Sequence, residues 1–298
     1  LRRSVNSSIR FLRDNSAMRV IGSGELLAGD RVQLTDERGK MHSFFLTPGH
    51  TWHSHKGWIR HDEIIGQSEG VVVKSSNGTP YQVFRPLLND YVLSMERGAT
   101  IIYPKDSAAI VGFADIAPGT KVLEAGAGSG ALSISLLRAI GSHGQLVSYE
   151  EREDFIEIAR RNVRDYFGNL PTNWELKKGP VQTCDLTSHF DRIVLDMLAP
   201  WECLEMVTRA LKPGGVLCLY VATTTQLSKC AESIKELKRF SEPESFELML
   251  RSWHHEGLAV RPQHSMNAHT GFLLFTRLMS TEFASIPRRR RPQSSNPR

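Results

Sequence analysis

The sequence predicts an α/β protein in which a parallel sheet is covered by helices on both faces and follows a small all-β domain. After Pro118, short apolar runs alternate with amphipathic segments, which is the pattern of such a sheet. A glycine-rich segment, residues 126–130, follows the first apolar run. Ahead of it, residues 30–95 hold short alternating runs separated by turn residues, which is typical of antiparallel strands.

The region after Pro118 divides into strands and helices of ordinary length. Its closing segments, residues 246–253 and 271–278, are rich in β-forming residues and are expected to form a terminal antiparallel pair. Residues 212–215 contain a proline and two glycines, which predicts a turn. We expect strands over residues 121–125, 145–149, 192–195 and 215–221, and helices over residues 132–140 and 155–167.

The all-β region is expected to contain two hairpins. The segment between its last two runs contains Asn77-Gly78, which is a strong signal for a tight hairpin turn. The expected strands are residues 32–35, 43–46, 71–74 and 81–84.

Both ends of the chain are more basic than its body. Residues 1–19 hold five Arg and one Asp, and residues 281–298 hold five Arg and one Glu. Since the net charge of the whole chain is only +5, the body between them carries about three net negative charges. Any basic binding surface on the body must therefore be a local patch or be assembled between subunits.

The changes in residue pattern and in charge along the chain divide it into four expected regions. The first tail is also compatible with an organellar transit peptide, because it is basic and poor in acids. The regions are a disordered basic tail (1–24), a small β-barrel-like domain (25–95), a Rossmann-like α/β domain (96–280) and a second disordered basic tail (281–298).

The composition excludes several other classes of protein. Hydrophobic residues make up 40% of the chain and charged residues 23%, which is typical of a globular protein. The four cysteines form no CxxC pair and no zinc-like array with histidine, so neither disulfides nor a metal site is predicted. No run approaches the roughly 18 apolar residues that a membrane span needs. We expect a soluble cytoplasmic protein.

The glycine-rich segment joins a predicted strand to a predicted helix. Gly126, Gly128 and Gly130 allow a sharp turn and the close approach of a ligand, and the helix that follows presents free N–H groups. Dinucleotide-dependent enzymes use a closely similar loop. The loop alone therefore predicts a ligand site without identifying the ligand.

Four acidic residues are expected at or near the carboxyl edge of the sheet. Glu124 lies in the strand before the glycines, where it can organise the loop or meet a cationic group. Glu150 ends the next strand, in position to accept two ribose hydroxyls. Asp185 follows an expected third strand and Asp196 ends a fourth. One acid at a strand end is more often a cap or turn residue, but four of them in step with the loop favour a ligand site.

This combination resembles the class I S-adenosylmethionine-dependent methyltransferases. The resemblance implies that S-adenosylmethionine is the cofactor and that Asp185 contacts its adenine amino group. Asp196 begins the run Asp-Met-Leu-Ala-Pro-Trp, at the position where methylases of exocyclic amino groups carry Asn/Asp-Pro-Pro-aromatic, and the proline pair is missing here. Adenine N1 already has an in-plane lone pair and needs no general base. A carboxylate that accepts a hydrogen bond from the neighbouring N6 amino group would orient the base and stabilise the charge that develops on it.

At a finer level, the chain resembles the bacterial and archaeal-type tRNA (adenine-N1)-methyltransferases that modify position 58 of the T-loop. The resemblance covers roughly residues 28–280 and excludes both tails. It is carried by the small β domain, by Ile102-Tyr103-Pro104-Lys105-Asp106, by residues 124–130, by Ser148-Tyr149-Glu150, by residues 196–201 and by His269-Thr270.

This second resemblance implies a substrate, an assembly and a set of site residues. The substrate is tRNA, and the assembly is a homotetramer in which a neighbouring subunit helps to hold it. Asp196 is the candidate catalytic residue, and Tyr103 helps to line the pocket for the target base. Phe155 differs from the family pattern because it offers only packing. The implied cofactor contacts are Gly126, Gly128, Ser129, Gly130, Ala131, Leu132, Glu150, Phe155, Asp185 and Asp196.

Three alternatives remain open at this point. The chain could be a methyltransferase that acts on a protein carboxyl group or a small molecule, since the glycine loop excludes neither. It could be a catalytically silent RNA-binding partner subunit, although the retained acids argue against this. A nicotinamide-dependent enzyme is a more distant third.

Basic residues on the β domain that are candidates for RNA contact are Lys56, Arg60, Lys74 and Arg85.

Overall fold

The computed structural model describes residues 24–266 and 268–280. Except for Gly24, the two predicted tails therefore lie outside the described residues. Within the described residues, no helix is long and apolar enough to cross a membrane.

The N-terminal part is built on a four-stranded antiparallel sheet with the order β2-β1-β6-β5. Two of its pairings are the predicted hairpins, β1 with β2 and β5 with β6. A separate hairpin, β3 with β4, packs on this sheet through Trp52, whose ring meets Tyr81 edge-on at 5.3 Å. The strands are β1 (Arg31–Asp36), β2 (Met41–Phe45), β3 (Thr51–Ser54), β4 (Gly57–Arg60), β5 (Val72–Lys74) and β6 (Pro80–Phe84).

The β3–β4 hairpin was not predicted from the sequence. Its strands are only four residues long, TWHS and GWIR, which is too short to show the apolar alternation that marks most strands. Gly57 makes its turn possible, because it has a φ of +101° and a Cβ there would lie 2.6 Å from the Ser76 hydroxyl oxygen.

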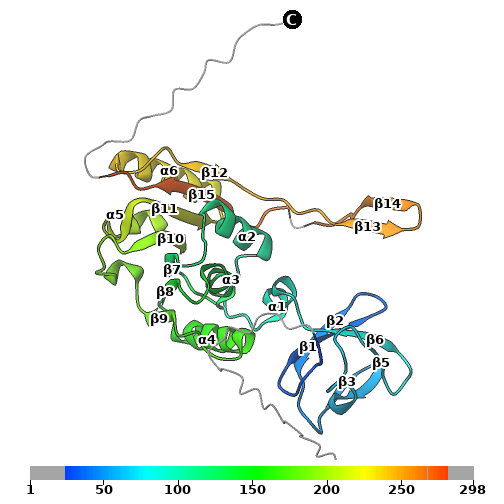
Figure 1. The fold of residues 1–298 in the computed structure, drawn as a ribbon. Helices are drawn as coiled ribbons and strands as arrows, with labels where there is room; N and C mark the ends of the chain where they lie inside the picture. Colours follow the sequence, from blue (N-terminus) through cyan, green and yellow to red (C-terminus); the bar gives the residue numbers. More distant parts are fainter. Residues whose placement is uncertain (1–23, 267, 281–298) are drawn as a thin grey trace, which may run out of the picture.

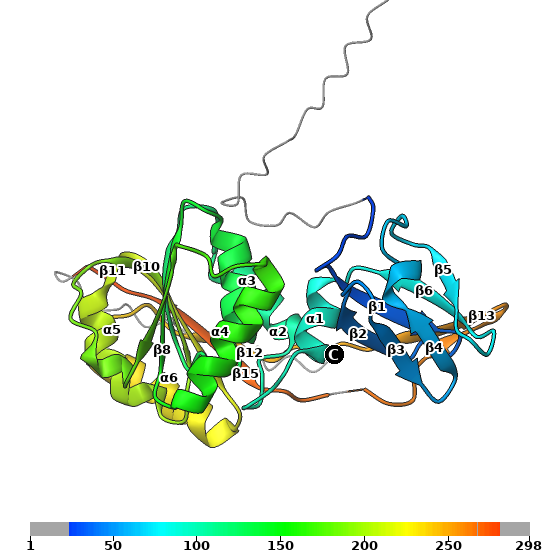
Figure 2. The ribbon, with the colours of Figure 1, turned by 90° about the horizontal axis from the view of Figure 1, so that it is seen from below.

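Two helices connect this sheet to the rest of the molecule, α1 (Leu88–Ser94) and α2 (Pro104–Phe113). The buried Tyr91 of α1 donates a hydrogen bond from its hydroxyl to the carbonyl oxygen of Asn162, at 2.7 Å. Pro104 starts α2 at its first turn, where a missing N–H costs nothing. Figures 1 and 2 show both helices between the β domain and the larger sheet.

The larger sheet has seven strands in the order β12-β15-β11-β10-β7-β8-β9. Its strands are parallel except β15, which runs antiparallel to both of its neighbours. The chain order reverses between β7 and β10, and open α/β sheets bind ligands at the carboxyl ends of strands at such a point. The strands are β7 (Lys121–Ala125), β8 (Gln145–Glu150), β9 (Trp174–Lys178), β10 (Phe190–Asp196), β11 (Leu211–Val221), β12 (Glu244–Phe246) and β15 (Phe272–Arg277).

Helices cover both faces of this sheet, as the alternation of its strands requires. Val122 packs with α2, α3 (Ala131–Ile140) and α4 (Glu153–Phe167) in one buried cluster. Its neighbour Leu123 points to the other face, where it packs with α5 (Leu204–Ala210) and α6 (Thr224–Leu237). The predicted helices and strands of this region are thus present, in the layered arrangement that the sequence predicts.

Two predictions near the end of the chain need correction. The terminal antiparallel pair forms, but its first strand is β12, so most of the predicted segment 246–253 lies outside it. The turn predicted over residues 212–215 is an irregular stretch inside β11, where the register against β10 shifts. Gly214, with a φ of +80°, accommodates that bulge.

A long arm, residues 247–269, leaves the sheet after β12; residue 267 within it is not described. The arm carries a small hairpin of β13 (Trp253–Glu256) and β14 (Ala259–Pro262), and then returns to β15. Figure 1 shows this hairpin projecting away from the sheet, on the side where the β domain lies.

Candidate active site

The glycine loop brings the end of β7 against the end of β10. Gly126, Gly128 and Gly130 all have positive φ values, between 53° and 82°, which other residues adopt only with strain. A Cβ on Gly126 would lie 1.9 Å from the carbonyl oxygen of Asp196. Only glycine at this position therefore lets the Asp196 backbone approach the loop.

Glu150 holds the loop from the end of β8. One of its carboxylate oxygens accepts a hydrogen bond from the Gly128 N–H at 2.9 Å, and the other accepts from the N–H groups of Glu151 and Arg152 at 3.0 Å. A carboxylate has about four acceptor sites, so Glu150 can still accept a hydrogen bond from a ligand hydroxyl.

Glu124 is fully buried beneath the loop. Its Oε2 accepts hydrogen bonds from the hydroxyls of Ser133 and Ser148, at 2.6 and 2.5 Å, while its Oε1 has no partner among the described residues. Burial raises the pKa of Glu124 to about 7, the two serine hydroxyls oppose the shift, and the nearby charge of Glu150 adds to it. The two hydrogen bonds from the serines join β7 to α3 and β8 rather than to the loop itself, so both predicted roles of Glu124 stay predictions.

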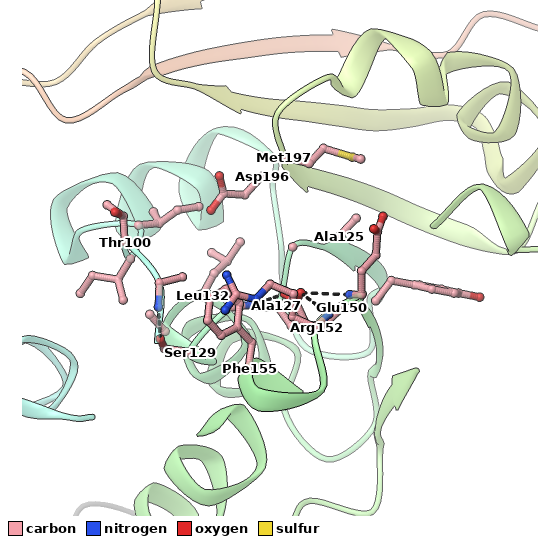
Figure 3. Close-up of a pocket in the computed structure, with 18 of the residues that line it drawn as sticks. Thr100, Ala125, Ala127, Ser129, Leu132, Glu150, Arg152, Phe155, Asp196 and Met197 are labelled. Atoms are coloured by element: carbon pink, nitrogen blue, oxygen red, sulfur yellow. Dashed lines mark hydrogen bonds between the residues drawn. The ribbon is translucent and has the colours of Figure 1, made fainter. Parts of the chain in front are cut away.

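Asp196 ends β10 with a half-buried side chain. Among the described residues, no hydrogen bond or ion pair reaches its carboxylate, although its backbone touches the loop. Burial raises the pKa of Asp196 to about 7, with further contributions from the charges of Glu124 and Glu150. Figure 3 shows this carboxyl group above the glycine loop, turned toward the space between Thr100 and Leu132.

These groups surround a cavity of about 670 Å³, which is in the range of sites for ligands of cofactor size. We call residues 125–132 with residues 149–155 the glycine-loop wall, and residues 99–102 with residues 196–198 the outer wall. Of the predicted site residues, the cavity brings together Gly126, Gly128, Ser129, Ala131, Leu132, Glu150, Phe155 and Asp196.

Three predicted site residues do not line this cavity. Gly130 instead begins α3 as its N-cap, and Tyr103 occupies the same position at the start of α2, one residue beyond the outer wall. Asp185 is exposed and lies near Tyr149, which does line the cavity. Burial raises the pKa of Tyr149 to about 12, with smaller contributions from Cys184 and Asp185. The ligand roles of Tyr103 and Asp185 stay predictions.

Other lining residues were not singled out from the sequence. Arg152 places its guanidinium 3.8 Å from the centre of the Phe155 ring, so the two side chains form one cation–π pair on the glycine-loop wall. Residues 99–102 and Met197 with Leu198 complete the outer wall. Residues 99–101 lie in a connection between helices, and no sequence signal distinguishes them from an ordinary linker, whereas Ile102 begins one of the runs that carry the family resemblance.

Ser129 joins the two walls. Its hydroxyl oxygen accepts hydrogen bonds from the N–H groups of Gly98 and Ala99, at 3.0 and 3.4 Å. Its carbonyl oxygen accepts another from the Asn162 side chain at 2.8 Å. Ser129 was predicted as a cofactor contact, and its hydroxyl also positions the outer wall.

The charges at this site fit a cationic ligand. The charge of Glu150 raises the pKa values of both Glu124 and Asp196, and no cation contributes to either shift. S-adenosylmethionine carries a sulfonium and an ammonium group, and the contact between its ribose and Glu150 stays a prediction. Among the described residues, no cluster of His, Cys, Asp and Glu side chains could hold a metal ion.

The fold and this site define a class I S-adenosylmethionine-dependent methyltransferase. A crystal structure of an S-adenosylmethionine-dependent O-methyltransferase from Thermotoga maritima has a TM-score of 0.81 and 29% identity, and the match covers 90% of this chain and 97% of that one. The match to tRNA (m1A58) methyltransferase TrmI from Aquifex aeolicus has a TM-score of 0.76 and 30% identity, covering 86% of this chain and all of that one.

Sequence comparison identifies the family. Residues 24–73 match the TrmI-like N-terminal domain, and residues 82–258 match the tRNA methyltransferase complex GCD14 subunit family. The chain is also 35% identical over 245 residues to the tRNA (adenine(58)-N(1))-methyltransferase TrmI of Thermus thermophilus, covering 82% of this chain and 95% of that protein. The chain belongs to this family of tRNA methyltransferases, and the family resemblance of the sequence is confirmed.

Proposed function

We propose that this protein transfers a methyl group from S-adenosylmethionine to N1 of the adenosine at position 58 in the tRNA T-loop. The observation that carries the proposal is the Asp196 carboxylate, which has no partner among the described residues and faces the cavity beside the glycine loop. The similar Thermotoga maritima protein is described as an O-methyltransferase. Because a similar fold goes with a different acceptor atom, the substrate has to be argued from the site.

When bound, S-adenosylmethionine supplies an activated methyl group. Adenine N1 needs no general base, so the role of this chain is to orient the base and to stabilise the positive charge that develops on it. The Asp196 carboxylate accepts a hydrogen bond from the N6 amino group and performs both tasks. Its neighbours on the outer wall, Met197 and Leu198, give the base an apolar surface.

The glycine-loop wall holds the cofactor. Glu150 would accept the ribose hydroxyls, and the N–H groups at the start of α3 would bind the amino-acid end of the cofactor. Phe155, which carries the Arg152 guanidinium 3.8 Å from the centre of its ring, would pack against the adenine. Asp185, near Tyr149 at the edge of the cavity, completes the cofactor contacts by accepting from the adenine amino group.

The target adenosine has to leave the folded T-loop of the tRNA before it can enter the site. A T-loop adenosine is stacked and paired, so extruding it costs a few kcal/mol, and contacts elsewhere on the tRNA must offset this. Two of the four basic candidates on the β domain are committed to ion pairs, Lys56 with Asp36 at 2.7 Å and Arg85 with Asp30 at 2.6 Å.

The other two candidates are better placed for RNA. Within the described residues, Arg60 and Lys74 form no ion pair, and Arg60 lies over the ring of the partly exposed Trp58. Such a pair offers a stacking surface and a positive charge together. Since the body of the chain carries no net positive charge, we propose that a cytoplasmic homotetramer gathers these patches from neighbouring copies around one tRNA.

The decisive experiment is methylation of unmodified tRNA by the purified protein alone, followed by mapping of reverse-transcription stops across the T-loop. A methyl group on N1 blocks Watson–Crick pairing, so a strong stop at position 58 is the expected result. Cofactor binding without any such stop would retain the methyltransferase and contradict this substrate. Failure to bind S-adenosylmethionine in calorimetry would favour a silent partner subunit instead.

A further inference from the structure

His269 and Thr270 lie just before β15, and the proposed function gives neither of them a role. The two ring nitrogens of His269 each face one acceptor: Nδ1 lies 2.9 Å from a carboxylate oxygen of Glu247, and Nε2 lies 2.9 Å from the Ala222 carbonyl oxygen. Neither partner can donate, so both hydrogen bonds form only when both nitrogens carry a proton. The geometry therefore selects the charged imidazolium.

One of these bonds leads to the outer wall. Ala222, just after β11, donates its N–H to the side-chain oxygen of Gln226 at 3.2 Å, and the Gln226 amide donates to the Leu198 carbonyl oxygen at 2.9 Å. Leu198 lines the cavity two residues after Asp196. His269 thus supports the turn that holds the segment carrying Asp196.

The residue that follows His269 is tied to the other part of the outer wall. The Thr270 hydroxyl donates to the Asp106 carboxylate at 2.7 Å and accepts from the Lys105 ammonium at 2.6 Å. Asp106 is fully buried in the first turn of α2, directly after the segment that lines the cavity. The Tyr220 hydroxyl donates to the Thr270 carbonyl oxygen at 2.7 Å. Residues 269 and 270 therefore connect both segments of the outer wall.

The second bond of His269 closes the base of the arm. Glu247 directly follows β12 and His269 comes shortly before β15, so the pair joins the two points where the arm leaves and rejoins the sheet. Figure 1 shows that the β13–β14 hairpin projects from this base. His269 therefore connects the base of the arm to the hydrogen bonds that lead to the outer wall.

We propose that His269, as an imidazolium, is a positioning residue for methyl transfer that clamps the base of the arm to the outer wall and so keeps Asp196 in place for the target adenosine. This inference rests on the proposed function. Deprotonation removes one of the two hydrogen bonds, so turnover on tRNA falls at alkaline pH while cofactor binding on the other wall is unchanged. The charged groups that face His269 are Glu247, which favours the imidazolium, and Lys105, which opposes it, and the Phe272 ring packs at 4.7 Å.

The hydrogen bonds to the Ala222 carbonyl and to Glu247 raise the pKa of His269 from its ordinary value. The side chain is nearly half exposed, so the charge stays accessible to solvent and responds to pH. This places the loss of the clamp on the alkaline side of the ordinary histidine range.

The test compares kcat and KM for tRNA between about pH 6 and pH 9 in the wild type, His269→Gln and Glu247→Gln, with the Kd for S-adenosylmethionine measured by calorimetry. We expect His269→Gln to lower kcat about fivefold at neutral pH, to lose the alkaline decline of the wild type, and to keep its cofactor affinity. Glu247→Gln should move the alkaline decline to lower pH, because the carboxylate no longer favours the imidazolium.

A matched control exists on the arm itself. His254 and Glu256 form a similar exposed pair at 3.2 Å within the β13–β14 hairpin, and no hydrogen bond among the described residues joins this pair to the outer wall. His254→Gln should therefore retain the wild-type profile.

Two results would overturn the inference. One is a wild-type kcat with an unchanged alkaline decline in His269→Gln. The other is a loss of cofactor binding in both His269→Gln and Glu247→Gln, which would mean that the pair supports the fold as a whole. Absence of tRNA methylation by the wild type would instead remove the proposed function itself, and would be seen before any variant is compared.

Discussion

The two walls of the cavity are built in different ways. The glycine-loop wall comes from one continuous stretch that runs from β7 through α3 and β8 to the start of α4, and backbone N–H groups bound by Glu150 hold it. The outer wall joins segments far apart in the chain. Side chains such as Ser129, Gln226 and Thr270 hold it from other elements.

This difference separates two tasks of the site, which are binding of the cofactor on the glycine-loop wall and orientation of the target base on the outer wall. The glycine-loop wall is held by contacts within one continuous stretch, which suits a cofactor that is the same in every reaction cycle. The outer wall is held by side chains of other elements, so it depends on the charge and the position of those elements. The outer wall is therefore the part that can respond to the substrate, and variants of the two walls should fail in different ways.

The largest effect is expected where the two walls touch. In Gly126→Ala the new Cβ would meet the Asp196 carbonyl oxygen, so we expect a loss of about 2 to 4 kcal/mol in the free energy of unfolding and no measurable methylation. Denaturant unfolding and tRNA methylation measure both. Gly119→Ala is the control, because Gly119 has a similar positive φ of +88° but open space around it; equal losses in the two variants would contradict this account of the contact.

The next effect concerns the outer wall alone. Asp196→Ala should lower kcat by about a hundredfold to a thousandfold while the fold is largely kept. Asp196→Asn retains an acceptor oxygen without the charge, so its kcat should lie between those of the wild type and Asp196→Ala. Single-turnover methylation measures methyl transfer, and calorimetry measures the binding of S-adenosylmethionine separately. Full activity of Asp196→Ala would contradict the role assigned to Asp196.

A smaller effect is expected from Glu124, the acid that is buried beneath the glycine loop. The pKa of Glu124 is raised to about 7 in the folded protein, so its contribution to stability is fully present below the pKa of the unfolded chain and is lost as pH rises through about 7. The Tm of the ligand-free wild type should fall between about pH 5 and pH 8 more steeply than that of Glu124→Gln. Glu232→Gln, on the exposed face of α6, is the control and should keep the wild-type slope. Parallel Tm curves for wild type and Glu124→Gln would exclude Glu124 as the cause.

The smallest effect is expected outside both walls, on the β domain. Arg60→Ala should raise the KM for tRNA about threefold and reduce its salt dependence, because a free cation near a phosphate contributes mainly through released counterions. Lys56→Ala removes a lysine that is already paired with Asp36, so the salt dependence of its KM should stay as in the wild type. Identical salt slopes for wild type and Arg60→Ala would remove Arg60 from the RNA surface.

By itself, the sequence determined the fold class, the family and most of the glycine-loop wall. The signals for Gly126, Gly128 and Glu150 are local, because a strand, a tight turn and a helix N-terminus are set by neighbouring residues and recur in one order. The alternation that puts Val122 on one face of the sheet and Leu123 on the other is local in the same sense.

Only the tertiary structure decided the outer wall and the arm. No local pattern places Thr100 opposite Leu132, links Lys105 at the start of α2 to Thr270 before β15, or leaves Asp196 without a partner among the described residues. The tertiary structure also places Tyr103 and Asp185 off the cavity wall, although the sequence analysis singled out both residues. Contacts between distant segments depend on how whole elements pack, and a pattern that reports only on its own neighbourhood does not contain that information.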